Sequence, residues 1–266
     1  ALVARTDNAS GAAITLDNAA NDVDSIDLQS RNADNSADAS GVLTFVDTDG
    51  FDVVDLGSTG NAILTAGDSV TQTNPIFVGG LGLSGAGSYT LENTNNEIST
   101  FASDATGNVS LVSSLALSLG SINPTGVTTG GANFTLTAPS FDSDGQTIDT
   151  EDTTAGGSAG DVTITTNGTG GSGNLTIGVV DAAGTNAAAS SDDNGGNAGN
   201  VVLTAGGDTL SIAGAVTARA GTGDGAGSAG TDGRLTLVAA SGAIDQQNGT
   251  TEMSVGELYV QEASGT

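Results

Sequence analysis

The segment TLENTNNEI, residues 90–98, indicates how this chain folds, because residues 15–23, TLDNAANDV, nearly repeat it. Extended to Ile26 and Phe101, the comparison covers twelve paired positions, of which four are identical and five are exchanges between similar residues. Internal repetition of this kind is typical of proteins that stack one structural unit on the next. The echo therefore predicts a stacked repeat protein.

A glycine followed by a short alternating run recurs along the chain. Apolar side chains stand two residues apart in these runs, as Val162 and Ile164 do. Period two predicts β-strands with one buried face, and no segment keeps helical spacing over the about ten residues that a helix needs. The chain is therefore predicted to be all-β. The clearest runs are GNVSLV (107–112), GANFTLTA (131–138), GDVTIT (160–165), GNVVLTA (199–205) and GRLTLVA (233–239).

The spacing of these runs predicts parallel rather than antiparallel strands. From GNAILTA (60–66) onward, and with GSYTL (87–91) and GNLTIGV (173–179) included, successive glycine-led strands begin 13 to 34 residues apart. This spacing suits one coil of a parallel solenoid with two or three short strands. A second echo pairs GGSAGDVTIT (156–165) with GGNAGNVVLT (195–204). We predict a single continuous β-solenoid over residues 1–266, with roughly eleven irregular coils. The coils are expected to be more regular in 1–150 and richer in glycine, with longer acidic loops, in 151–266.

The composition excludes several classes of function. The chain has no Cys, His, Trp or Lys, and its four Arg stand against 31 carboxylates, for a net charge of −27. Nucleic acids and anionic membranes are repelled by such a charge, since binding them relies on clustered Lys and Arg. No apolar stretch approaches the about 18 residues that a membrane span requires. We therefore expect no nucleic-acid partner and no membrane insertion.

Catalysis is not expected either. Without His or Lys, the usual bases that activate Ser or Thr nucleophiles are absent. Glycoside hydrolysis needs only two carboxylates, but sugar sites usually also present aromatic platforms, and the chain has two Tyr, six Phe and no Trp. The sequence predicts a protein that is not an enzyme and has no cofactor, with calcium as the one alternative left open.

Two acidic turns have the spacing of calcium ligands. DTDGFD places carboxylates around Gly50, and DSDGQTID places carboxylates around Gly145. Hard oxygen ligands spaced in this way can converge on Ca²⁺, although neither turn completes the twelve-residue loop with its terminal Glu. The same acids also suit turn formation and a solubilising surface, so both interpretations stay open. The candidate ligands are Asp47, Asp49, Asp52, Asp142, Asp144 and Asp149.

Two long polar loops are candidates for a contact surface. They are DTEDTTAGGSAG (149–160) and AAGTNAAASSDDNGGNAGN (182–200). Loops often carry binding residues, but polar loops of this kind are also common as plain solvated insertions.

The repeats resemble a known family. GNVVLTAGGDTLSIAGAV (199–216), TLDNAAND (15–22) and GNAILTAGDSVTQ (60–72) are similar to the degenerate stalk repeats of filamentous-haemagglutinin-like exoproteins, large bacterial surface adhesins. The likeness covers almost the whole chain, and its motifs are largely compositional. The resemblance implies a right-handed parallel β-helix, export from a Gram-negative-type bacterium to the extracellular space or cell surface, and a mechanical or adhesive role.

Taken together, these features predict a structural segment of a surface fibre or adhesin. NASG (8–11), DASG (38–41) and EASGT (262–266) read as the same unit boundary. The expected partner is therefore further coils of a longer parent chain or another copy in a filament, with a host or neighbouring-cell surface as a further partner. Two alternatives stay open, namely a row of calcium-bridged β-sandwich adhesin domains that bind a ligand at their loop tips, and a β-helical polysaccharide-processing enzyme.

Overall fold

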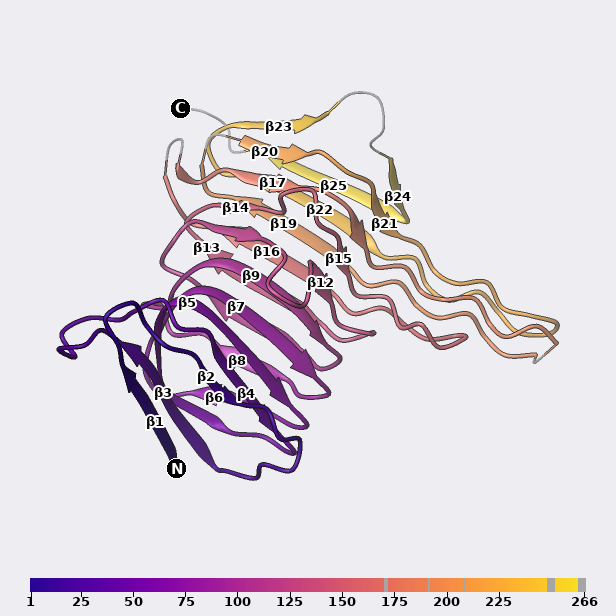
Figure 1. Cartoon of the computed structure of the whole chain (residues 1–266). Helices are drawn as coiled ribbons and strands as arrows, with labels where there is room; N and C mark the ends of the chain where they lie inside the picture. The colour runs from indigo at the N-terminus through magenta and orange to yellow at the C-terminus, as the bar shows by residue number, and fades with distance from the viewer. Residues whose placement is uncertain (170–171, 191, 208, 248–251, 263–266) are drawn as a thin grey trace. The chain divides into compact units, whose positions relative to one another are not determined.

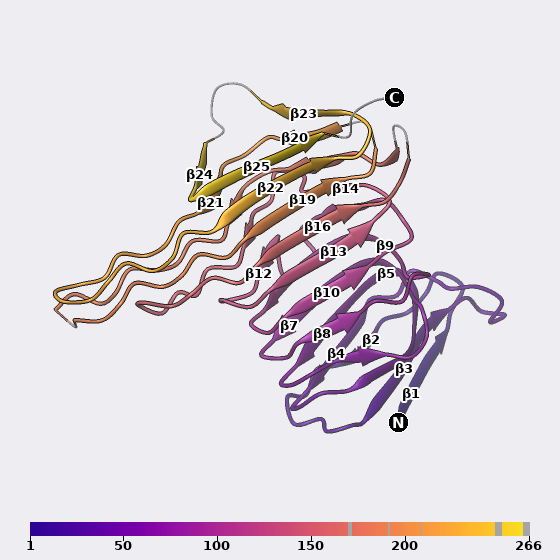
Figure 2. The same cartoon turned by 180° about the vertical axis from the view of Figure 1, so that it is seen from behind.

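The computed structural model describes residues 1–169, 172–190, 192–207, 209–247 and 252–262, which form strands, turns and loops but no α-helix (Figures 1 and 2). The predicted all-β class is confirmed. Nothing in these ranges could serve as a membrane-spanning helix. The EASGT boundary lies, apart from its first residue, outside the described residues.

The chain forms two compact units, Ala1–Thr125 and Gly126–Thr266. Each unit is described by itself below. A single solenoid running through 1–266 stays a prediction.

In the first unit, the longest strand is β5 (Asp52–Ala66), which pairs in parallel with four other strands. β1, β3, β5, β7, β9 and β11 form one parallel row, β2 and β4 join the second half of β5, and β8 pairs with β10. The other strands are β1 (Leu2–Asp7), β2 (Ile14–Leu16), β3 (Ser25–Arg31), β4 (Leu43–Asp47), β6 (Thr71–Gln72), β7 (Ile76–Gly85), β8 (Tyr89–Leu91), β9 (Glu97–Ala105), β10 (Val109–Val112) and β11 (Leu117–Leu119).

In the second unit, strands pair in parallel with the strand three places later in the chain. Three rows result: β13-β16-β19-β22-β25, β14-β17-β20-β23 and β12-β15-β18-β21-β24. The strands are β12 (Val127–Thr128), β13 (Phe134–Ala138), β14 (Phe141–Asp142), β15 (Ile148–Asp149), β16 (Val162–Thr166), β17 (Leu175–Ile177), β18 (Val180–Asp181), β19 (Val201–Ala205), β20 (Thr209–Ile212), β21 (Val216–Ala218), β22 (Arg234–Ala239), β23 (Ala243–Gln246), β24 (Met253–Val255) and β25 (Glu257–Glu262).

The registers confirm the echo between residues 156–165 and 195–204, because Val162 pairs with Val201 and Ile164 with Leu203. In the described residues, the β-strands of each unit pair with one another in parallel. They do not fit the β-sandwich alternative, whose sheets are antiparallel.

The buried core of the second unit consists of aliphatic columns. Within a row, inward side chains lie directly above one another, and the alternation of buried and half-buried residues along each strand follows the predicted period of two. Ile164 and Leu203 are fully buried, and so are their neighbours along the column. One column contains Phe134, Val162, Val201 and Leu235, and the next contains Leu136, Ile164, Leu203 and Leu237.

The long loops of the second unit are ordered against one another. We call the described parts of loops 150–161, 182–200 and 219–233 the fin, since in both views they run side by side away from the strands (Figures 1 and 2). Each loop closes on itself, as when Gly196 N–H donates to Thr185 O at 2.9 Å, and each bonds to the next, as when Gly221 N–H donates to Gly196 O at 2.9 Å. This layering belongs to neither interpretation of the loops drawn from the sequence, a contact surface or solvated insertions.

Glycine permits the close approach of these loops. A Cβ atom added at Gly196 would lie 1.7 Å from Gly157 O, and one added at Gly221 would lie 1.8 Å from Thr185 O. Both distances are far below van der Waals contact, so only glycine fits. The high glycine content of 151–266 therefore has a packing cause.

A ladder of asparagine side chains connects the layers of the second unit. Asn197 Oδ1 accepts the backbone N–H of Thr231 at 2.8 Å, which lies 34 residues later in the next layer. Such bonds satisfy backbone donors that adjacent loop strands would otherwise leave to water. The same bond joins Asn186 to Thr222, Asn194 to Ser228 and Asn200 to Arg234.

The echo between residues 15–23 and 90–98 marks a repeated corner in the first unit. Asn21 Nδ2 donates to Leu16 O at 3.1 Å and to Val46 O at 3.0 Å. The equivalent Asn96 Nδ2 donates to Leu91 O at 3.1 Å and to Val112 O at 3.0 Å. The repeated asparagine thus ties its own corner to the strand of the following layer. This explains why the sequence is repeated at these positions.

Candidate functional site

The first predicted calcium turn contains one inward and two outward carboxylates. Asp47, at the end of β4, is buried, and its carboxylate accepts the backbone N–H groups of Val23 and Asp49, each at 3.2 Å. Asp52 begins β5, and its carboxylate accepts the hydroxyl groups of Thr71 at 2.9 Å and Thr73 at 2.6 Å. The Asp47 carboxylate is therefore engaged with the backbone of its own turn and of the segment at Val23.

Asp49 and Asp52 line an open hollow of about 370 Å³ together with two carboxylates that sequence spacing did not indicate, Asp24 and Asp68. The pKa of Asp49 is raised by its side-chain contact with Asp47, by burial, and by the negative charges of Asp47, Asp24 and Asp68. Asp24 and Asp68 come from other layers of the first unit, so only the registers between strands could have revealed them.

The carboxylates of the second predicted calcium turn are divided between two strand pairs, β14 with β17 and β15 with β18. Asp142 lies beside Thr176, and its carboxylate accepts the N–H of Asp144 at 2.8 Å in a turn where Asp144 and Gly145 have φ angles of 48° and 70°. Asp149 lies beside Asp181 on β18. Burial and then the Asp181 charge raise the pKa of Asp149, and burial followed by Asp181 and Asp149 raises that of Glu151.

Within the described ranges, no three acidic side chains form a group that could hold a metal ion. This holds for the hollow lined by four Asp as well, because lining one open hollow does not make carboxylates converge on a single point. Calcium binding by Asp47, Asp49, Asp52, Asp142, Asp144 and Asp149 stays a prediction.

Charged, polar and apolar side chains lie close together on the outward face of the β3-β5-β7-β9 row. Gln29, Gly57, Phe77 and Glu97 occupy one line across these strands, because Gln29 pairs with Gly57, Gly57 with Phe77 and Phe77 with Glu97. The glycine leaves room for a side chain from loop 32–42: a Cβ at Gly57 would lie 3.0 Å from Asp38 Oδ1. Asp38 is therefore seated against the sheet.

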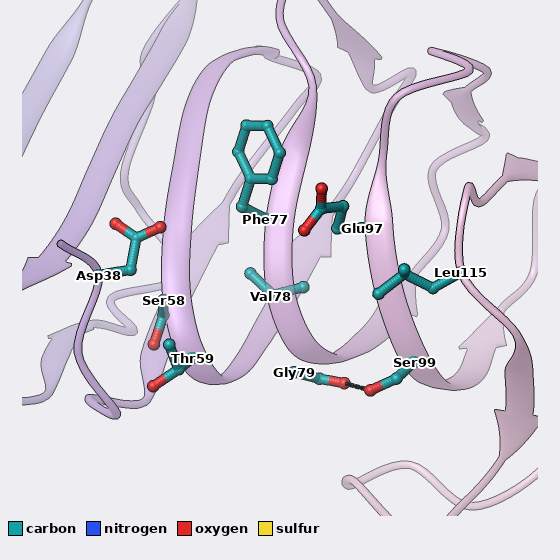
Figure 3. A pocket seen from close by; sticks show the side chains of 9 residues that line it. All are labelled: Asp38, Ser58, Thr59, Phe77, Val78, Gly79, Glu97, Ser99 and Leu115. Atoms are coloured by element: carbon teal, nitrogen blue, oxygen red, sulfur yellow. Dashed lines mark hydrogen bonds between the residues drawn. The ribbon is translucent and has the colours of Figure 1, made fainter.

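Two adjoining hollows open along this line, and we call them together the acidic groove. One, of about 280 Å³, is lined by Asp38, Phe77, Glu97 and Leu115 among others (Figure 3). The other, of about 350 Å³, shares Asp38 and Phe77 and adds Gln29, Arg31, Asp55 and Gly57. In Figure 3 the Phe77 ring stands out from β7 between Asp38 on one side and Glu97 on the other.

Negative charge dominates the acidic groove. Burial, followed by the charges of Asp27 and Asp38, raises the pKa of Asp55, although Arg31 opposes this effect. Gln29 Nε2 bridges the carboxylates of Asp27 and Asp55, at 3.0 and 2.7 Å. Arg31 is committed to Asp38, with which it forms an ion pair whose side chains are about three-quarters buried.

Sequence reasoning did not single out these groove residues. Phe77 lies on a strand, and it is 37% exposed. The signal available in the sequence was the neighbouring IFVGG run, in which Ile76 and Val78 alternate with Phe77 and take the inward positions.

The chain was compared with family models, curated proteins and solved structures, and none of them matches it.

Proposed function

We propose that the chain is a structural segment of a bacterial surface fibre or adhesin, in which a right-handed parallel β-helix acts as a rigid rod without catalytic activity. The proposal rests on the filamentous-haemagglutinin-like repeats of the sequence and on the arrangement of the strands. In this proposal the rod is extracellular, and its length and stiffness are its function.

The observation that carries the proposal is the pairing of strands three places apart in the second unit. β13 to β15, β16 to β18, β19 to β21 and β22 to β24 each contribute one strand to every row. A backbone that visits three rows in turn and then starts again one strand further on is what a β-helix requires, so this order of strands supports the proposal. Each triplet is then one coil, stacked about 4.8 Å above the last.

Stacking of this kind explains how a small number of large side chains can stabilise a rigid body. Each fully buried Val, Leu or Ile contributes about 1.5–3 kcal/mol relative to an exposed one. Because every coil adds to the same columns, stability grows with the number of coils, as expected for a spacer of adjustable length.

Strand β25 supports end-to-end continuation. It pairs with β22 in the described part of the chain, and its Leu258 and Val260 continue the columns of Leu235 and Leu237 while remaining 49% and 50% exposed. An exposed edge with apolar inward positions is a template for another parallel strand. We place there a further coil of a longer polypeptide or a second copy.

The experiment that tests the function removes one coil in the bacterium that produces the chain. Deleting residues 201–234 joins Asn200 to Leu235, which already pairs with Val201, so the columns close again in register. We expect the protein to be exported and displayed on surface fibres in immunoelectron microscopy. Deleting residues 201–217 removes only half of a coil, joins Asn200 to Ala218 and misaligns the rows.

The two deletions separate a rod from other functions. A rod predicts that the larger, in-register deletion keeps fibres and that the smaller one abolishes them. Labelling confined to the cell interior, or fibres that survive both deletions equally, would reject the proposal.

A further inference from the structure

The acidic groove of the first unit suggests a partner chemistry that goes beyond a structural rod. Its walls are made by strands β5, β7 and β9, with Asp38 reaching in from loop 32–42 and Leu115 from the segment before β11 (Figure 3). Three properties of its lining groups define a complementary ligand: hydrogen-bonding capacity, apolar surface and charge.

The groove offers acceptors and few donors. Ser99 Oγ donates to Gly79 O at 2.7 Å, and Ser58 Oγ is bonded to Ala39 O and Gly41 O, so both hydroxyl protons are used inside the protein. The Gln29 amide is committed to Asp27 and Asp55. The carboxylates keep further lone pairs for a ligand, since an ionised carboxylate has about four acceptor sites. A sugar, which presents donors and acceptors alike, would leave many of its acceptors unmatched here.

The apolar surface lies between the carboxylates. Phe77 is 37% exposed and Leu115 is 41% exposed. A cation placed over an aromatic face is attracted by the ring quadrupole, and an alkyl stem gains from contact with exposed apolar surface. Phe77 stands between Asp38 and Glu97, so one ligand can meet the ring and a carboxylate together.

The charge of the lining is not balanced from within the protein. Asp38, Asp55 and Glu97 line the groove, whereas its one lining cation, Arg31, is paired with Asp38. Arg5, which shares a line with Gln29 across β1 and β3, is likewise paired with Asp7 at 3.1 Å. The net charge of −27 adds long-range attraction for a cation.

We propose that the acidic groove binds arginine or lysine side chains of a basic peptide segment in a partner protein. The alkyl stem lies along Phe77 and Leu115, and the guanidinium or ammonium group donates hydrogen bonds to Glu97 and Asp38. The adjoining hollow, where Asp55 lies, takes a second basic side chain of the same segment.

The test uses fluorescence anisotropy with the full chain at about 0.15 M salt, where distant surface charges are screened. The probe is a fluorescein-labelled peptide of alternating Arg and Ser, compared with a peptide in which citrulline replaces every Arg. We expect the citrulline peptide to lose binding. Glu97→Gln removes one charge, and Phe77→Leu keeps the apolar surface but removes the ring, so each should weaken binding about two- to fivefold.

A matched control and four opposing results complete the test. Asp245→Asn removes an exposed carboxylate from β23 in the second unit and should leave the affinity unchanged. Unchanged affinity in Glu97→Gln and Phe77→Leu, equal loss in Asp245→Asn, or equal binding of the citrulline peptide would overturn the proposal. Competition by spermidine at concentrations as low as those of the arginine peptide would also overturn it, since a free polyamine would then be the ligand.

Discussion

The strand rows and the fin of the second unit keep their layers together by opposite means. In the rows, side chains fill the interior, and Leu203 is fully buried between Ile164 and Leu237. In the fin, the absence of side chains allows backbones to meet, and Gly196 approaches Gly157 so closely that no Cβ fits. The rows depend on the volume of their buried side chains, whereas the fin depends on glycines that have no side chain.

This difference has energetic consequences. A buried aliphatic side chain contributes about 1.5–3 kcal/mol, whereas one hydrogen bond contributes about 0.5–1.5 kcal/mol net. Glycine also loses more backbone entropy on folding than other residues. The fin therefore needs many bonds for each layer, and we expect it to be the less stable region.

The largest effect is expected from emptying a column in the rows. Leu203→Ala should lower the free energy of unfolding by about 2–5 kcal/mol, because it leaves a cavity between neighbouring layers. Denaturant unfolding followed by circular dichroism measures this change. Val202→Ala, on the outward side of the same strand, should cost less than about 1 kcal/mol. Equal losses in the two variants would contradict the assignment of the buried face.

The next effect is expected in the fin. Gly196→Ala forces apart loops 150–161 and 182–200, at a cost of about 1–3 kcal/mol. Hydrogen exchange should accelerate in these loops while strand β19 stays protected. Gly145→Ala is the control, because Gly145 has a φ angle of 70° but no atom within 4 Å of an added Cβ. The backbone strain that Gly145→Ala introduces should leave hydrogen exchange in the fin unchanged.

A smaller effect is expected from the asparagine ladder. Asn197→Ala removes the acceptor for Thr231 N–H and should cost about 0.5–1.5 kcal/mol, seen as faster exchange of that amide. Asn197→Asp keeps an oxygen acceptor and should preserve most of the protection. If both variants behave alike, the side-chain bond does not hold the layers together.

The smallest effect concerns pH at the root of the fin, where Asp149 and Asp181 are stacked. The folded state raises the pKa of Asp149 and Glu151 above their ordinary values of 3.8 and 4.5, so it binds protons more tightly than the unfolded chain. Their contribution to stability is therefore present at low pH and is lost as pH rises through the raised pKa values. The midpoint of thermal unfolding should rise slightly as acidification brings the pH down through these raised pKa values.

One variant and one further carboxyl group check the sign of this pH effect. Asp149→Asn should reduce the rise of the unfolding midpoint on acidification, because it removes the charge that is stacked on Asp181. Asp232 should act in the opposite direction at lower pH, since the Ala220 N–H and Arg219 lower its pKa and its contribution disappears on protonation. A melting midpoint that falls steadily as the pH is lowered through the raised pKa values would contradict the assignment.

Much of the strand pattern was predictable from the sequence. Alternation in GDVTIT and GNVVLTA located β16 and β19 and their buried faces, and the echo of residues 156–165 in 195–204 gave their register. These predictions succeeded because side-chain period and backbone pairing are tied together in a strand.

The fin and the groove could not be predicted in the same way. Gly196 contacts Gly157, although the two residues are 39 positions apart in the chain. Neither segment has a periodic pattern of apolar residues, so the sequence showed only acidic, glycine-rich loops. The acidic groove gathers Asp38, Phe77 and Glu97 from three separate segments, and it forms because Gly57 makes room for Asp38. Asp24 and Asp68 were missed for the same reason, since they meet Asp49 only through the stacking of layers.

The fin also has a consequence for chemical durability. An asparagine followed by glycine is prone to lose its side-chain ammonia when the glycine nitrogen attacks the side-chain carbonyl. At Asn194–Gly195 both reacting groups are engaged elsewhere, because Gly195 N–H donates to Ser228 O at 2.9 Å and Asn194 Oδ1 accepts from Ser228 N–H at 2.8 Å. The neighbouring layer thus keeps the Gly195 nitrogen away from the side-chain carbonyl of Asn194. Deamidation at this site therefore requires that the layers first separate.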